Sequence, residues 1–125
     1  MKKTRTPKKV RTNPYAKLEK ALGYAFRTRR RLESALTHRS FRFETDPDLT
    51  DNQRLEFLGD AALGLVAASY LFRTRPELQE GGLTKLRSSI ASTRALSTFA
   101  ARIDLGDYLR LGRGEQLSGG TQRTS

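Results

Sequence analysis

Glu56 and Asp60, two acids four positions apart, are the first residues of this sequence that could carry chemistry. On a helix, side chains at this spacing share one face with Cβ atoms about 5–6 Å apart, so the two carboxylates could hold one cation together. Spacing alone is weak evidence, because Glu44 and Asp48 form a second such pair. The first pair is distinguished by its position just before the apolar stretch 61–72, where two like charges are costly.

A structural alternative for Glu56 and Asp60 is placement in a first helical turn, where acids complement the helix dipole. Gly59 lies between them and should cost about 1 kcal/mol relative to alanine inside a helix. We therefore expect another group to approach the backbone closely at Gly59. Composition leaves both interpretations of the acid pair open.

The remaining metal-ligand inventory is small. The sequence has no cysteine and one histidine, His38, so a metal must be held by oxygen ligands or by that side chain. A single histidine without a second histidine or cysteine nearby favours a structural or hydrogen-bonding role. We assign His38 no catalytic role.

The elements that position these residues are predicted to be helices, because apolar residues recur at helical spacing and no segment alternates as a strand does. Asn13 and Pro14 start the first helix and Gly23 ends it, while Thr28 caps the second. A loop is expected from Phe41 to Leu49. The all-α prediction rests on these five segments: 14–22, 28–36, 50–75, 83–90 and 96–103.

The long third helix is expected to be buried. Thr50 and Gln53 fit a capping box at its start, and Pro76 stops it after Arg75. Because residues 61–72 are apolar on every side, this part should lie in the core. Further loops are expected around Gly81 and Gly82, at Gly106, where the fifth helix ends, and over residues 109–125.

Charge indicates a polyanionic partner. The formal net charge is +11, with a computed pI near 10.7, and six Lys and Arg fall within the first twelve residues. We expect residues 1–13 to form a disordered basic tail and 14–125 a single domain. No unbroken apolar run reaches about 18 residues and no signal peptide is evident, so we expect a cytoplasmic protein without membrane contact.

Residues 52–60 read NQRLEFLGD and continue AALGL, which closely resembles the signature motif of ribonuclease III. The flanking segments LGYAF, LESALTHRS, LTKLRSSIAS and LGDYLRLGRGEQLSGG resemble the endonuclease domain of that family in the same order. The resemblance covers about residues 15–125. It implies a homodimeric endonuclease that uses Mg²⁺, or Mn²⁺, to cleave double-stranded RNA and leaves 5′-phosphate and 3′-hydroxyl ends.

The same resemblance assigns roles to single residues. It makes Glu56 and Asp60 the metal-binding and catalytic residues, with Asp60 closest to the chemistry, and it places Phe57 in the subunit interface. An ordinary core position is the alternative for Phe57. Gln53 stands where the family often has another glutamate, so only capping is retained for it.

The family completes its metal site with an aspartate and a glutamate three residues later, beyond the Gly-Gly loop. We therefore expect 14–125 to be the amino-terminal portion of the domain, without a double-stranded-RNA-binding domain and weakly active or inactive alone. One alternative is a non-catalytic module that binds duplex RNA and dimerises, and another is an unrelated basic helical protein. Lys85, Arg87 and Arg94 are candidates for phosphate contact that the sequence does not rank.

Overall fold

The structure, a computed structural model, describes residues 12–119, and within them all extended regular structure is helical. The all-α prediction is confirmed. The expected basic tail falls largely on residues 1–11, outside the described residues. The elements are α1 (Ala16–Leu22), α2 (Arg29–Ala35), α3 (Arg39–Thr45), α4 (Gln53–Thr74), α5 (Glu80–Ile90), α6 (Thr93–Arg102), the 3-10 helix η1 (Leu105–Tyr108) and α7 (Arg113–Leu117).

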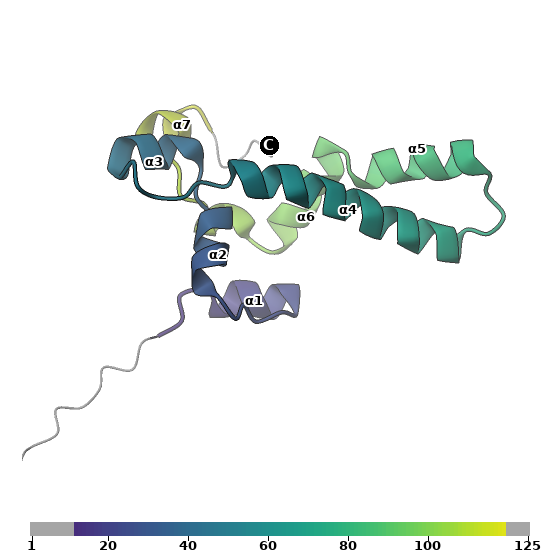
Figure 1. The fold of residues 1–125 in the computed structure, drawn as a ribbon, viewed down its shortest axis with the longest axis horizontal. Helices are drawn as coiled ribbons and strands as arrows, with labels where there is room; N and C mark the ends of the chain where they lie inside the picture. Colours follow the sequence, from purple (N-terminus) through teal and green to yellow (C-terminus); the bar gives the residue numbers. More distant parts are fainter. Residues whose placement is uncertain (1–11, 120–125) are drawn as a thin grey trace, which may run out of the picture.

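Helix α4 forms the long axis of the molecule (Figure 1). Helix α5 runs back along α4 in the opposite direction and makes the most extensive helix pair with it. Helices α3 and α7, far apart in sequence, pack together near the amino-terminal end of α4, and α1 and α2 lie at that same end on the other side (Figure 1). The first turn of α4 therefore stands where most of the other elements meet.

The main cluster of buried residues lies at this crowded end. Tyr15, Leu18, Leu32 and Leu36 form one cluster that joins α1 to α2. The chain from residue 103 to 109 covers the cluster with partly buried apolar side chains: Ile103, Leu105, Tyr108 and Leu109, together with Phe26. Leu18, which is 1% exposed, is the most buried of the four.

Several predicted boundaries are wrong. Residues 39–45 form α3 where a loop was expected after Phe41, because His38 acts as its N-cap and accepts a hydrogen bond of 3.2 Å from the Ser40 N–H. Gly81 and Gly82 lie in the first turn of α5, where the backbone N–H groups have no helical partner in any case. Gly106 does not end the fifth helix, which stops at Arg102, and lies in η1. Residues 113–117 form α7 within the segment expected to be loop.

The predicted burial of the long helix is also wrong for this chain. Within α4 only Ala67 and Leu71 are buried, and large apolar side chains on its other side are exposed, with Leu65 at 72% and Phe72 at 77%. The exposed apolar side of α4 would be buried, as its sequence predicts, only if another surface covered it. Among the described helices, α4 is also long and apolar enough to cross a membrane, a test that the core helix of a soluble protein passes too. The apolar run itself covers only residues 61–72, because Asp60 and Arg73 bound it.

Candidate catalytic groove on α4

The amino-terminal end of α4 is fixed by hydrogen bonds to the connection between α2 and α3. The Asn52 N–H donates to the Thr37 carbonyl oxygen at 2.9 Å, and Asn52 Nδ2 donates to the Ala35 carbonyl oxygen at 3.3 Å. Thr37 is 2% exposed, and its hydroxyl donates to the Glu33 carbonyl oxygen at 2.6 Å. Satisfied polar groups at a buried junction hold the chain in one arrangement, so the first turn of α4 has a defined position.

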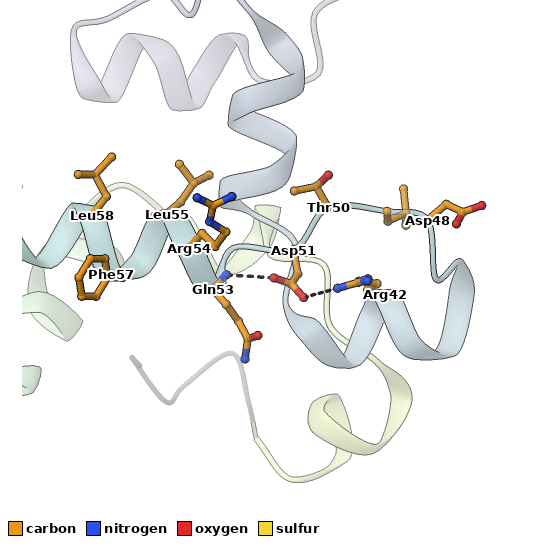
Figure 2. Close-up of a pocket in the computed structure, with 10 residues that line it drawn as sticks. Arg42, Asp48, Thr50, Asp51, Gln53, Arg54, Leu55, Phe57 and Leu58 are labelled. Atoms are coloured by element: carbon orange, nitrogen blue, oxygen red, sulfur yellow. Dashed lines mark hydrogen bonds and ion pairs between the residues drawn. The ribbon is translucent and has the colours of Figure 1, made fainter.

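Asp51 secures the start of the helix in place of the expected capping box. Its Oδ1 accepts a hydrogen bond from the Gln53 N–H at 3.1 Å, and its Oδ2 lies 3.3 Å from Arg42 Nη1 (Figure 2). Because α4 begins at Gln53, this residue occupies the first helical position and cannot close a box with Thr50. The predicted capping role of the Gln53 side chain is wrong.

Glu56 and Asp60 lie on one face of α4, as their spacing predicts. Ala67 and Leu71, seven and eleven residues after Asp60, continue this face and are buried. The two carboxylates are exposed, and they line a groove of about 510 Å³ whose far wall includes Leu96 of α6. The other lining residues are Gln53, Phe57, Gly59 and Leu63.

The two carboxylates have no competing partners. Within residues 12–119, no hydrogen bond or ion pair engages the side chain of Glu56 or Asp60. In the same part of the chain no group of three or more His, Asp or Glu side chains gathers at one point. Among the described residues the groove therefore offers two carboxylates and no third, a donor set that suits a Mg²⁺ ion that keeps several waters.

A larger hollow, of about 1090 Å³, opens on the other side of the same turn (Figure 2). Leu55, Phe57 and Leu58 give it an apolar wall. It has two acids, of which Asp51 is paired with Arg42, so only Asp48 is left without an ion pair. Its size does not make it the catalytic site, because it lacks an unpaired cluster of carboxylates. Its lining is that of a surface that another apolar group could fill.

Phe57 stands between the two hollows and lines both. Its side chain is 82% exposed, so the alternative of an ordinary core residue is wrong within this chain. An aromatic ring left in water on a rigid helix gains free energy when it is covered. Phe57 is therefore available for contact with another molecule.

Gly59 does not have the close neighbour that we expected. No atom of the described chain lies within 4 Å of the position that a Cβ would take there, and the same holds for Gly64 five residues later. Gly59 lines the groove and, without a side chain, leaves open the space between Glu56 and Asp60. Any group that approaches Gly59 must come from outside the described residues.

The remaining candidates from the sequence are one histidine and three cations. His38 has the hydrogen-bonding role predicted for it, because its Nδ1 lies 2.7 Å from Ser40 Oγ as well as accepting the Ser40 N–H. It lines neither of the two hollows described above. Lys85, Arg87 and Arg94 are exposed, and the structure does not rank them either.

The residues that tie α7 to α3 were not among the sequence candidates. Ser40 and Glu44 accept hydrogen bonds from the backbone N–H groups of Gly112 and Arg113, at 2.9 and 2.7 Å. In addition, Arg110 forms an isolated parallel bridge with Thr37. These contacts join positions about 70 residues apart, so no local sequence pattern predicts them.

Comparison with known proteins gives one consistent result. The family model described as "Ribonuclease-III-like" matches residues 29–125. The chain is 50% identical over 111 residues to ribonuclease 3 of Syntrophotalea carbinolica, which spans 88% of this chain and 48% of that protein. It is 47% identical over 113 residues to ribonuclease 3 of Helicobacter pylori strain P12, spanning 90% and 45%. The chain thus spans about half the length of the curated relatives it matches.

Solved structures give the same likeness in three dimensions. A nuclease domain of ribonuclease III from Campylobacter jejuni superposes with a TM-score of 0.79 at 38% identity, over 87% of this chain and 73% of that one. That structure is described as showing flexibility in a region involved in dimer formation. A second structure of the same nuclease domain has the same TM-score at 37% identity.

Proposed function

This chain belongs to the ribonuclease III family, and from that premise we propose that it forms part of an endonuclease that cleaves double-stranded RNA. The observation that carries the proposal is the pair Glu56 and Asp60, two exposed carboxylates without partners on one face of an anchored helix. The family match includes all of α4, and for this reason we propose that α4 is a nuclease-domain helix and not a membrane span. The cytoplasmic location stays a prediction.

We propose that Glu56 and Asp60 hold Mg²⁺, with Mn²⁺ as a substitute. When bound, the ion would supply Lewis-acid polarisation of the scissile phosphate. The chain's own contribution is positional: α4 keeps the two carboxylates one turn apart, and Asp51 and Asn52 keep the helix start in place. Because neither carboxylate has to leave another partner, no existing interaction opposes metal binding.

We propose further that the protein acts as a homodimer and that Phe57 is part of the subunit interface. The support is its 82% exposure beside an apolar hollow on a rigid helix. A second copy would bring its own Phe57 to an equivalent surface, as two-fold symmetry requires. The dimer would also place two carboxylate grooves on one RNA duplex.

The 125-residue chain alone is proposed to cleave weakly or not at all. The described residues supply two carboxylates to the groove and no third acid nearby. This observation also favours the second candidate function, a module that binds duplex RNA and dimerises without cleaving it. Cleavage assays separate the two.

The experiment compares a labelled RNA duplex with each of its single strands, in Mg²⁺, in Mn²⁺ and in EDTA. It uses both the 125-residue chain and a protein that continues through the whole nuclease domain. We expect the longer protein to cut only the duplex, only with metal, and to leave ends that RNA ligase rejoins without prior treatment. Equal cleavage of single strands, or cleavage in EDTA, would refute the proposal, while duplex binding without any cleavage by the longer protein would support the non-catalytic module.

A further inference from the structure

The net charge of this protein is confined to its first quarter. Residues 1–31 contain twelve Lys and Arg and a single acid, so they account for the whole formal charge of +11. Residues 32–125 contain twelve cations and twelve acids and are neutral overall. The polyanion that the charge predicts should therefore meet the amino-terminal end of the molecule, and not only the groove on α4.

Four arginines bring this charge onto the folded part of the chain. They stand within five positions at the start of α2, and each is exposed. The first turn of α2 contains no acid, so cations stand at the end of the helix where the dipole disfavours them. We call this set the arginine corner: Arg27, Arg29, Arg30 and Arg31.

The acids nearest to the corner in the sequence contact other partners. Glu19, the single acid of the first 31 residues, accepts hydrogen bonds from the Phe26 N–H at 3.4 Å and from Asn13 Nδ2 at 3.2 Å. Glu33, one turn along α2, lies 4.0 Å from Arg110 Nη2. Among the ion pairs of residues 12–119, none includes a member of the arginine corner. Within the described chain, no ion pair neutralises these four arginines.

The corner is rigid as well as basic. Phe26 and Leu32 flank it in the sequence and both pack into the core cluster of α1 and α2. This cluster lies at the end of the molecule away from α5 (Figure 1). The arginine side chains thus project from a fixed backbone, which lowers the entropy lost when they bind.

We propose that the arginine corner is a second contact surface for duplex RNA, which grips the phosphate backbone outside the carboxylate groove. The proposal rests on the proposed function for the identity of the polyanion. Guanidinium groups match phosphate oxygens in a two-pronged geometry, and contacts of this kind position a duplex without reading its sequence. A membrane surface fits less well, because Leu32 is buried and Phe26 packs against the core cluster, so neither of the two apolar residues that flank the corner is free to insert into lipid.

The test measures duplex-RNA affinity against salt concentration in EDTA, so that binding is read without metal-dependent cleavage. Each phosphate contact adds about 0.9 to the slope of log affinity against log salt. Changing all four arginines to glutamine should lower the slope by about 2–3 and weaken binding at least about tenfold near 0.1 M salt. The fourfold change to lysine, which keeps the charge, should retain most of the slope.

The matched control neutralises four exposed cations that are not candidates for phosphate contact: Arg73, Arg75, Arg102 and Arg113. It should change the slope less than the corner variant does. An unchanged slope in the corner variant, or an equal loss in the control, overturns the proposal. Loss of binding to phosphatidylserine vesicles with RNA binding intact overturns it in favour of a membrane.

The RNA-affinity test of the arginine corner and the cleavage assay can fail independently. If the corner variant loses RNA affinity while no form of the protein cleaves RNA, the surface stands and the endonuclease proposal fails. If the protein cleaves duplex RNA and the corner variant binds as tightly as wild type, the endonuclease stands and the surface fails. Thermal unfolding checks that the exposed substitutions leave the fold intact.

Discussion

The backbone N–H of Gly112 donates a hydrogen bond of 2.9 Å to Ser40 Oγ, and so fastens the start of α7 to α3 across 72 positions of sequence. The Arg113 N–H extends this clasp to Glu44 Oε2 at 2.7 Å. The same Ser40 hydroxyl lies 2.7 Å from His38 Nδ1, and the His38 N–H donates to the Arg110 carbonyl oxygen at 2.9 Å. Residues 38–44 and 110–113, far apart in the sequence, thus meet beside the α2–α3 connection that anchors α4.

The first prediction is that Gly112→Ala destabilises the protein by about 1–3 kcal/mol, because a new methyl group in a filled space forces the backbone to shift. A Cβ there would lie 2.7 Å from Glu44 Oε1 and 2.9 Å from the Ser40 carbonyl oxygen. The matched control is Gly114→Ala, since no atom lies within 4 Å of its Cβ position. Chemical denaturation measures both, and equal stability of the two variants would show that α7 is not held against α3.

The second prediction concerns Phe57, which is 82% exposed. Phe57→Ala should weaken self-association about tenfold or more, because an aromatic anchor at an interface contributes about 2 kcal/mol or more. The unfolding free energy of the monomer should hardly change, since no cavity forms. Analytical ultracentrifugation over a concentration series gives the dissociation constant.

Phe72→Ala is its control, on the same helix and 77% exposed. This variant should dimerise as wild type does. If both substitutions weaken the dimer equally, the interface is the whole apolar side of α4, and Phe57 contributes no more to it than Phe72 does. If neither does, the interface lies elsewhere.

How far the sequence predicts this structure depends on how local the cause is. Gly23 ends α1 in a left-handed conformation as expected, because a helix end of this kind is determined by one residue. The helix α4 and the shared face of Glu56 and Asp60 follow from periodicity in the same way. Local patterns therefore place the candidate site on its element.

What the sequence does not predict depends on distant partners. His38 is not among the usual cap residues, so the sequence predicts a loop where the His38 ring in fact accepts the Ser40 N–H and starts α3. The exposure of α4 is the reverse case: its apolar residues predict that it will be covered, but they do not say by what. The groove wall that Leu96 supplies also follows from tertiary packing alone.

The third prediction is that deleting residues 2–11 flattens the salt dependence of duplex-RNA binding. This segment carries six of the chain's 24 Lys and Arg, and each cation that neutralises a phosphate contributes to the slope. The deletion should act independently of the arginine corner, so combining it with the corner variant should give additive losses of slope. A deletion variant with the wild-type slope would show that the tail makes no phosphate contact.

The fourth prediction is that Asp60→Asn, in a protein with the whole nuclease domain, abolishes Mg²⁺-dependent cleavage and leaves duplex binding nearly unchanged. The amide keeps the shape of the side chain but loses the charge that holds the ion. Asp107→Asn, at an exposed position in η1, is the control and should cleave normally. Wild-type turnover of Asp60→Asn in saturating Mg²⁺ would remove Asp60 from the site.

The last prediction is that the 125-residue chain cleaves duplex RNA negligibly even when it folds and dimerises. Two Mg²⁺ ions bring a charge of +4, and Glu56 with Asp60 offers −2 from each groove, too little to hold two cations about 4 Å apart in a two-metal site. One weakly held ion remains compatible with the groove, and each 1.4 kcal/mol lost from transition-state stabilisation slows cleavage about tenfold. The measurement is the rate on a long duplex for the chain and for a protein extended through the domain, at equal dimer concentration. Comparable Mg²⁺-dependent rates, both removed by Asp60→Asn, would show that these two carboxylates suffice.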